Sequence, residues 1–557
     1  MLLCFFLKGD YMDKLKNIKG SSMNRRSFLR ASAVGTLGLA TAAVIGCSDD
    51  GDNKSSSSAP APAAPAAAPK APAATHLTFG KGSLGETMNP NLASRRSVEW
   101  AACYENVCTT YQGPDGPYLK PYLATSWEVD PKDSSWIFNL RDSEWSDGKK
   151  VTADDVGFTI KYAANPENKS RLISRVNTFD SYEVIDDKTV RFRTKKPDAT
   201  WANRMSLAFI QPRHIYEDAT KGPNEQAVRP VGSGPYLITN YVKDALIEGV
   251  ESPSSWKGNV GIKSWKMNVI KEHTTRVAAF ETGEVDWIDT VPLQEVERVT
   301  AMDGVQVQSS TPYGTAGYHI SGWQSEGYPT NDVRVRKAYN LATDIDALGK
   351  EIYSGYFASA KGQPTVTDVL GHEPNISDYG YDPDAARQLM KDAGMPNGFK
   401  QKYDTHSLNS EAVPMATAVA GFLDENIGVE SELQTIDIST WRDGLYGRAP
   451  RTPIFANTWH STSMFDAGFC FTWYLSNNAA KYYNNKEFDK NYEESLTVFD
   501  PAARAEVYKK NVKMLHDDAV GLFVVDTSRF MAWRPAVIPS YEIREDPQLI
   551  LHETTLA

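Results

Sequence analysis

Residues 121–162 read PYLATSWEVDPKDSSWIFNLRDSEWSDGKKVTADDVGFTIKY and contain the clearest succession of secondary-structure signals in the chain. Apolar side chains at Trp136, Phe138 and Leu140 alternate with other residues, which is the period-two pattern of a strand with one buried face. The tripeptide Ser146-Asp147-Gly148 supplies turn residues, because glycine tolerates a positive φ and aspartate can bond the backbone that follows it. The stretch therefore predicts a strand followed by a tight turn.

A helix is predicted directly after this turn. Thr152 can cap its first turn, and Asp155 lies three residues later as the reciprocal acid of a capping-box pattern. Val156 and Ile160 then begin an apolar face at helical spacing. The adjacent acids at 154 and 155 have the composition of a glycosidase carboxylate pair, but helix capping accounts for them better.

Tryptophans at positions 127, 136 and 145, followed by TADDV, resemble the signature of a known family, the bacterial extracellular solute-binding proteins of family 5. Members of that family serve ABC importers for peptides, nickel and oligosaccharides. Further elements match the family in its order: YENV at 104–107, PYLATSWE at 121–128, VGSGPY at 231–236, RVAAFETGEVD at 276–286, DVRVRKA at 332–338 and YDPDAA at 381–386. The resemblance extends from about residue 75 to the end of the chain.

This resemblance implies an α/β fold with two lobes, the type II arrangement of periplasmic binding proteins, with an extra subdomain in the first lobe. A chain of 557 residues is also too long for a single hydrophobic core. We expect lobe I to comprise residues 76–311 and 524–557, and lobe II to comprise residues 312–523. Hinge strands near residues 312 and 524 are expected to join the lobes.

Periodicity predicts several elements of the second lobe. Apolar residues at spacings of three and four predict one long helix over 331–352. A second helix is predicted over 383–394, because proline favours the first turn and glycine the position just past the last one. A third helix is expected over 501–516, followed by a buried strand at 521–525 that returns toward lobe I.

Three segments precede the folded body. Met23 stands where a start codon is expected, so residues 1–22 are interpreted as a misassigned extension. Residues 23–46 combine paired arginines with a short apolar run and resemble a twin-arginine signal peptide, whose ending resembles a lipobox with Cys47 as the lipidated residue. Residues 47–75 predict a Ser/Pro/Ala-rich tether. We therefore expect an exported protein, periplasmic or on the cell surface, held to the membrane by an N-terminal lipid; a simple transmembrane anchor is the alternative.

Composition restricts the partners. A formal net charge of −11 disfavours nucleic acid, because phosphate contacts need clustered Lys and Arg. No Cys-x-x-Cys or His-x-x-x-His spacing occurs, so we expect neither a bound metal nor a cofactor. Cys103 and Cys108 lie five residues apart, and a disulfide between them requires a break in any helix that contains both; their pairing is left open.

Residues 80–85, GKGSLG, have the spacing of a dinucleotide-binding fingerprint. Such a site needs a helix to begin there so that its amide groups face the pyrophosphate, but Asn89-Pro90-Asn91 interrupts instead. The match is interpreted as fortuitous. In the resembled family this loop borders the ligand cleft, which implies that Asn89 lies beside the ligand.

Residues 454–478 form the candidate ligand segment. They combine many aromatic residues with polar ones and show neither a helical nor a strand period, which is typical of a loop lining a cleft. A buried loop that fills a lobe is the alternative. The resemblance implies that this segment contributes to the pocket through Trp459, Phe465, Asp466 and Trp473, and we expect Tyr313 to join them from the crossing between the lobes.

The class of solute remains open between two alternatives. In peptide-binding members of the family, an aspartate three residues after the loop tryptophan clamps the ligand's amino group, whereas here Thr462 occupies that position and Asp466 follows four residues later. A missing acid would leave a buried ammonium unpaired unless another carboxylate replaces it. We keep a peptide as the leading expectation and an oligosaccharide as the alternative, because aromatic rings can stack on sugars. Scattered histidines make nickel less favoured.

We therefore expect the substrate-binding component of an ABC importer, a monomer that captures its solute between two lobes and delivers it to a membrane permease. No Gly-x-Ser-x-Gly, His-Glu-x-x-His or Walker sequence is present, so no catalytic residues are assigned and the chain is not expected to be an enzyme. A secreted enzyme acting on carbohydrates or peptides is the competing class.

Overall fold

The computed structural model of the protein describes residues 75–84, 87–92, 97–113, 116–131, 133, 135–218, 222–320, 327–406, 410–460, 464–540 and 549–557. The predicted signal peptide, the lipidation residue Cys47 and all but the last residue of the predicted tether lie outside these residues, as does Thr462. Residues 71–557 form one compact unit. No helix within the described part of the chain is both long and apolar enough to cross a membrane.

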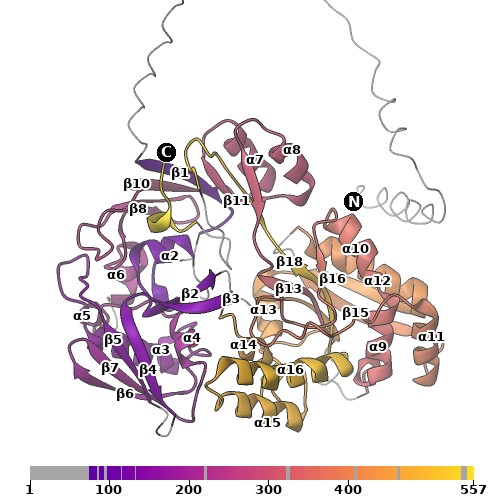
Figure 1. The fold of residues 1–557 in the computed structure, drawn as a ribbon. Coiled ribbons are helices and arrows are strands. Elements are labelled where there is room, and N and C mark those ends of the chain that lie inside the picture. Colours follow the sequence, from indigo (N-terminus) through magenta and orange to yellow (C-terminus); the bar gives the residue numbers. More distant parts are fainter. Residues whose placement is uncertain are drawn as a thin grey trace, which may run out of the picture. The chain divides into compact units, whose positions relative to one another are not determined.

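Seven strands form the sheet of the first lobe (Figure 1). In spatial order they are β12 (Gln306–Ser309), β19 (Phe530–Trp533), β11 (Trp287–Val291), β1 (His76–Lys81), β10 (Ser264–Val269), β9 (Leu246–Glu251) and β8 (Tyr236–Val242). β1 lies at the centre and runs parallel to both of its neighbours. The helices of this lobe's core are α2 (Val98–Cys103), α7 (His273–Glu281) and α8 (Val296–Thr300).

A four-stranded antiparallel sheet forms the extra subdomain. Its strands, in spatial order, are β4 (Ala124–Asp130), β5 (Ser135–Leu140), β7 (Thr189–Thr194) and β6 (Phe179–Asp186). The remaining elements of this region are α3 (Ala153–Ala164), the hairpin β2 (Cys108–Gly113) with β3 (Gly116–Pro121), and the short helices α4 (Trp201–Met205), α5 (Arg213–Tyr216) and α6 (Gly222–Val228). Trp136 and Phe138 of β5 are buried with Val156 and Ile160 of α3 in one core, so the predicted strand and helix pack on each other.

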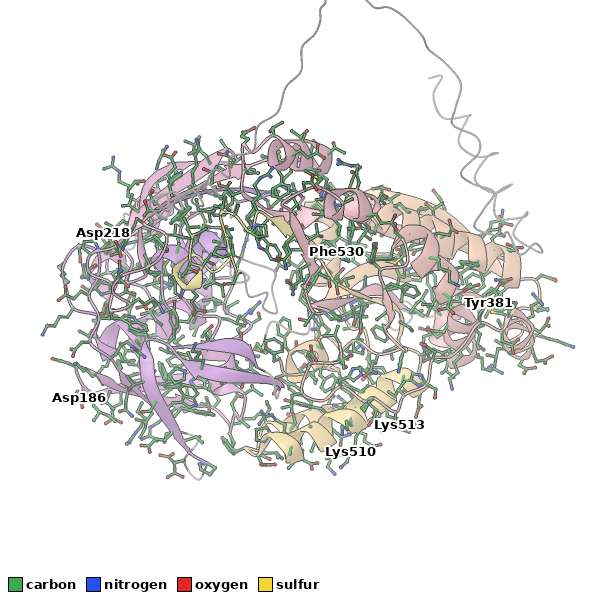
Figure 2. All side chains as sticks on the ribbon, turned by 45° about the horizontal axis from the view of Figure 1, so that its top comes forward. Asp186, Asp218, Tyr381, Lys510, Lys513 and Phe530 are labelled. Atoms are coloured by element: carbon green, nitrogen blue, oxygen red, sulfur yellow. The ribbon has the colours of Figure 1, made fainter. Side chains whose placement is uncertain are left out.

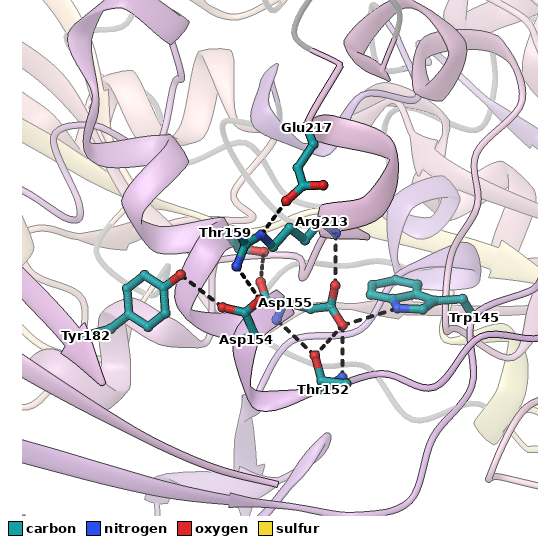
Figure 3. Close-up of polar contacts among 8 residues, drawn as sticks. All are labelled: Trp145, Thr152, Asp154, Asp155, Thr159, Tyr182, Arg213 and Glu217. Atoms are coloured by element: carbon teal, nitrogen blue, oxygen red, sulfur yellow. Dashed lines mark hydrogen bonds and ion pairs between the residues drawn. The ribbon is translucent and has the colours of Figure 1, made fainter. Parts of the chain in front are cut away.

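The predicted capping box at the start of α3 is confirmed (Figure 3). The Asp155 amide donates to Thr152 Oγ1 at 3.3 Å, and the Thr152 amide donates to Asp155 Oδ2 at 2.9 Å. Asp154 bonds elsewhere: it accepts from Tyr182 Oη at 3.1 Å and forms an ion pair with Arg213. Both carboxylates therefore have structural partners.

Six strands form the sheet of the second lobe (Figure 1). In spatial order they are β14 (Ala358–Ser359), β18 (Gly521–Thr527), β13 (Gly314–Ile320), β17 (Ile454–Trp459), β15 (Phe399–His406) and β16 (Val429–Ile436). One core of the lobe contains side chains of α9 (Val333–Ala342), α10 (Ile345–Ile352), α11 (Pro383–Asp392) and α12 (Ala412–Ile427). A second core contains side chains of α13 (Ile438–Leu445), α14 (Gly468–Phe471), α15 (Lys486–Ser495) and α16 (Pro501–Asp517).

The expectation of a loop throughout 454–478 is wrong for its first six residues, which form β17. This strand lies between β13 and β15, and five of its six residues are buried. A strand that is buried on both faces loses the alternation of apolar and polar residues by which strands are recognised. The sequence pattern was therefore aperiodic although the backbone is regular.

The expectation of one helix over 331–352 is also wrong, because α9 ends at Ala342 and α10 begins at Ile345. Thr343 between them has an extended backbone, with φ −101° and ψ 117°. Asp344 then caps α10 by accepting a hydrogen bond from the Ala347 amide at 2.9 Å. The apolar stripe continues across this break, so spacing alone did not show it.

The chain passes between the two sheets twice, at 310–313 and at 528–529. The first passage lies beside the expected boundary at residue 312. The expected return at residue 524 falls inside β18, whose pairing with β13 continues as far as Thr527 opposite Gly314. The return therefore comes about four residues later than expected, because cross-strand pairing keeps all of β18 in the second sheet.

The two lobes also touch away from these crossings. The Ala199 amide of the subdomain donates to the Leu496 carbonyl at 2.8 Å, and Asn203 Nδ2 donates to the Met464 carbonyl at 3.0 Å. An exposed ion pair joins Lys196 to Glu493 at 2.9 Å. The subdomain is thus linked to the segment on either side of α15 in the second lobe.

Cys103 and Cys108 are buried thiols that form no disulfide with each other, which answers the question that the sequence left open. Residues 231–236, the VGSGPY element of the resemblance, lie against Cys103. A Cβ atom added at Gly232 would lie 1.7 Å from the Cys103 carbonyl oxygen, so this position requires glycine. The turn serves close packing of two backbones.

Candidate ligand-binding site

Three strands of the second sheet bring their ends together next to the crossings. Thr315 of β13 pairs in register with Trp459 of β17 on one side and with Asp526 of β18 on the other. Residues directly opposite in neighbouring strands point to the same face of a sheet. An indole, a hydroxyl and a carboxylate therefore form one row across the sheet, where the chain leaves for the first lobe.

Aromatic rings lie beside this row. The rings of Tyr313 and His460 stack with centroids 5.6 Å apart, and the Arg529 guanidinium lies 4.9 Å from the centre of the Tyr313 ring. On the return segment, Phe530, labelled in Figure 2, packs edge-on against Tyr356 with centroids 4.8 Å apart. Tyr313 is half-buried, so part of its ring remains accessible at the crossing.

Trp459, at the end of β17, lies beside the crossing, but its ring faces inward. It is 1% exposed and contacts His319 and Phe523, with ring centroids at 4.5 and 4.9 Å. Trp473 is half-buried and lies against Tyr446 at 5.3 Å. Of the two predicted tryptophans, Trp473 presents the more accessible ring.

Phe465 and Asp466 lie in the interior of the second lobe. Asp466 is fully buried and forms an ion pair with Arg504 Nε at 3.2 Å, while its Oδ1 accepts from the Gly468 amide at 2.9 Å. Phe465 is 5% exposed and has a φ of +51°, a strained value for a bulky residue. The structure thus shows Asp466 with an internal partner and Phe465 as part of the same tightly constrained turn.

The side chain of Asn89 forms hydrogen bonds within its own loop and to α5. Its side-chain oxygen accepts from Tyr216 Oη at 2.8 Å and from the Asn91 amide at 3.1 Å, and its side chain is 6% exposed. Of the six predicted ligand residues, the sheet register brings only Tyr313 and Trp459 to the crossing. The other four lie in separate segments, and contact of any of the six with a solute stays a prediction.

Sequence reasoning missed a stack of three side chains on the same face of the sheet. His319 stacks on Tyr482 with ring centroids 3.4 Å apart, and the Arg451 guanidinium lies 3.8 Å from the centre of the Tyr482 ring. Burial lowers the pKa of His319 well below its usual value, so this imidazole is neutral at pH 7. The stack reinforces the wall of aromatic rings behind the strand ends.

Sequence reasoning also missed Asp526 as a candidate residue of the site. It is 7% exposed, and Thr315 Oγ1 donates a hydrogen bond to its Oδ1 at 2.8 Å. Burial raises the pKa of Asp526 to about 7, although the bond from Thr315 opposes this rise. The only signal in the sequence is a single acid that interrupts the apolar run GLFVVDT at 521–527.

No cluster of three or more potential metal ligands occurs among the residues that the structure describes. The arrangement offers half-buried aromatic rings and one buried carboxylate at a junction between two α/β lobes. This architecture, in which the chain passes twice between two sheets, defines a two-lobed periplasmic-type binding protein.

The family model for bacterial extracellular solute-binding proteins, family 5 (middle region), matches residues 118–481, which is more than half of the chain. The chain belongs to this family, so it is a solute-binding protein of the extracellular or periplasmic kind. The family and the α/β two-lobed fold expected from the sequence are confirmed.

Similar proteins span most of the chain. Heme-binding protein A of Haemophilus influenzae is 26% identical over 448 residues, covering 75% of this chain and 81% of that protein. The dipeptide-binding protein of Escherichia coli K12 is 24% identical over 447 residues, covering 75% and 82%. Among solved structures, the periplasmic binding protein DppA of Helicobacter pylori in complex with the peptide STSA has a TM-score of 0.72 at 22% identity, covering 86% of this chain and 98% of that one.

Proposed function

We propose that the protein captures a peptide-like solute between its two lobes and delivers it unchanged to the permease of an ABC importer. Membership of the solute-binding family carries this proposal. It is supported by the similarity to a dipeptide-binding protein and to a structure that holds a tetrapeptide.

Capture would use the two crossings as hinges. A protein whose lobes are joined by short segments can move between open and closed arrangements, and a solute that contacts both lobes favours the closed one. Chemistry on the solute is not required by this cycle. We propose that Tyr313 and Trp473, which are half-buried, contact the solute. The buried residues of the predicted set would support the wall of the pocket without contacting the solute directly: Trp459, Phe465, Asp466 and Asn89.

An oligosaccharide is the alternative solute, and the burial of the aromatic rings helps to decide between it and a peptide. Stacking on a sugar needs an accessible ring face. In the aromatic segment, the rings of Trp459, Phe465, Phe471 and Tyr474 are all at most 5% exposed. Few faces are therefore available for stacking, which favours a peptide over a sugar.

A ligand screen tests the proposed function. The folded body, residues 71–557, would be titrated with a tryptic digest of casein, cello- and xylo-oligosaccharides, nickel–histidine and hemin, with thermal unfolding as the readout and product analysis to detect turnover. We expect the peptide digest to raise the melting temperature with concentration and to be recovered unchanged, because binding to the native state alone stabilises it. Stabilisation by a sugar, nickel–histidine or hemin but not by peptides would overturn the peptide assignment, and conversion of the digest would indicate an enzyme.

We further propose that the protein is an exported monomer held to a membrane by a lipid on Cys47. The sequence before the folded body supports this, through its paired arginines and the lipobox-like VIGC. Changing Cys47 to Ala should remove metabolic labelling by a radioactive fatty acid and release the protein from the membrane fraction. Unchanged labelling of the variant would refute the assignment.

A further inference from the structure

Asp526 differs in its surroundings from half of the other buried acids among the described residues. Several of those acids have a cation within ion-pair distance: Glu99 has Lys81 at 3.4 Å, Asp198 has Arg204 at 3.0 Å and Asp466 has Arg504 at 3.2 Å. Asp526 is 7% exposed, and among the described residues it forms no ion pair. An isolated buried carboxylate is unfavourable when it is ionised, so a cation from outside the chain would stabilise Asp526 in its charged form.

Among the described residues, the electrostatics of Asp526 involve burial and the hydrogen bond from Thr315 but no compensating charge. β13 presents Thr315 in register, and the edge strand β14 presents the exposed Ala358. Of the described residues beside the crossing, Arg529 and His460 both have side chains that contact the ring of Tyr313. The carboxylate therefore faces a hydroxyl and a methyl group at the edge of the sheet.

The hydrogen bond from Thr315 prepares Asp526 as an acceptor. A hydroxyl that donates to a carboxylate favours its ionised form, whereas burial favours the neutral form. With the pKa of Asp526 near 7, the two forms are close in free energy at physiological pH. A small gain in free energy from a bound cation would then favour the ionised form of Asp526. Shifted pKa values of this kind are typical of binding sites.

We propose that Asp526, oriented by Thr315, receives a primary ammonium group of the captured solute. The inference rests on the proposed function and adds the chemical feature by which the solute is recognised. Position 462, where peptide-binding relatives were expected to carry the acid, is a threonine, so this chain needs a carboxylate from another element. β18 supplies one, at the point where it leaves for the first lobe.

The proposal predicts how binding depends on pH. Below pH 7 the carboxyl group takes up a proton, so affinity should fall about tenfold for each pH unit. Above about pH 8 a terminal amino group loses its proton, so affinity should fall again. Binding of peptides with free amino groups should therefore be strongest between roughly pH 7 and 8.

The test uses the tryptic casein digest in two forms: untreated, and acetylated at every amino group. Binding to the folded body is measured by thermal shift and by mass spectrometry of the retained peptides. The variant is Asp526→Asn, which keeps the size and the hydrogen bond from Thr315 but removes the charge. The matched control is Asp404→Asn, because Asp404 is an equally buried acid of the same sheet, 6% exposed, whose carboxylate accepts from the Thr452 amide at 3.2 Å.

We expect the wild type and Asp404→Asn to retain the untreated digest and to lose the acetylated one. Asp526→Asn should bind the untreated digest at least ~30-fold more weakly, since one member of a buried charge pair is removed. Its unfolding in the absence of peptide should be no easier than that of the wild type, because a neutral side chain suits this buried position, and this readout separates lost binding from failed folding.

Equal retention of both digests by the wild type, or full retention by folded Asp526→Asn, would overturn the ammonium site while leaving peptide capture intact. Failure of the wild type to retain either digest would instead overturn the proposed function, and the ammonium site with it.

Discussion

At the scale of single residues, the buried acids separate into two kinds. Asp466 lies in the interior with its charge compensated by Arg504 at 3.2 Å. Asp526 lies at the crossing, where the hydroxyl of Thr315 donates a hydrogen bond to it and, among the described residues, no ion pair forms. Both are aspartates in apolar surroundings, so the sequence around each looks similar. Their effects on stability should nevertheless be opposite in sign.

Changing Asp466 to Asn should destabilise the protein by about 3–5 kcal/mol, because it leaves the guanidinium of Arg504 buried without a counter-charge. Chemical denaturation of the folded body would measure the change. Asp526→Asn serves as the control, since it removes a buried carboxylate that no cation compensates. Equal stability of Asp466→Asn and the wild type would show that this ion pair has no structural role.

Asp526 should also make stability depend on pH. Its pKa is raised from 3.8 to about 7 on folding, so the unfolded state releases its proton first as the pH rises. The wild type therefore loses stability relative to Asp526→Asn as the pH rises from about 4 to 7, by at most roughly 4 kcal/mol, and the difference stays constant above pH 7. Urea denaturation of both proteins at pH 5, 6, 7 and 8 would show this trend. A difference that does not grow with pH would contradict the raised pKa.

At the scale of elements, local chemistry explains where helices begin and end. The start of α3 follows from Thr152 and Asp155, and the break between α9 and α10 follows from Asp344. The start of α3 was predicted and the break before α10 was not, although a capping interaction marks both places. The difference is that the apolar stripe at 331–352 continues through the break and conceals the cap.

Changing Thr152 to Ala should cost about 1 kcal/mol, because the Asp155 amide loses its acceptor, the Thr152 hydroxyl, while the bond from the residue 152 amide to Asp155 can remain. Thr417→Ala is the control, since this exposed threonine in α12 only bonds the Val413 carbonyl of its own helix at 2.9 Å. Alanine has the higher helix propensity, so the control should be neutral or slightly stabilising. Equal losses for the two variants, measured by chemical denaturation, would argue against the capping role.

At the scale of the whole molecule, the two lobes are joined by two crossings and by contacts of the subdomain with the second lobe. Opening about the crossings should separate those contacts, since they lie elsewhere in the fold (Figure 1). We therefore expect these contacts to stabilise the closed arrangement. Solute affinity should depend on residues at this remote contact.

Changing Asn203 to Ala should weaken peptide binding by roughly two- to tenfold, because one hydrogen bond to the Met464 carbonyl is lost from the closed state. Calorimetric titration with a peptide retained in the screen would measure it. Lys196→Ala is the control: its ion pair with Glu493 is exposed on both sides and should contribute little. Unchanged affinity of Asn203→Ala would mean that the contact persists in the open state.

The family, the α/β class and the local elements of the signature stretch could be inferred from sequence, because each depends on residues that lie within a few positions of one another. The site could be inferred only in part. Thr315 and Asp526 are 211 residues apart, and nothing in either segment indicates that β13 and β18 are neighbours. Cross-strand register and burial arise when the whole chain packs. These determine that Asp466 forms an ion pair inside a lobe, whereas Asp526 is held at the crossing by the hydroxyl of Thr315.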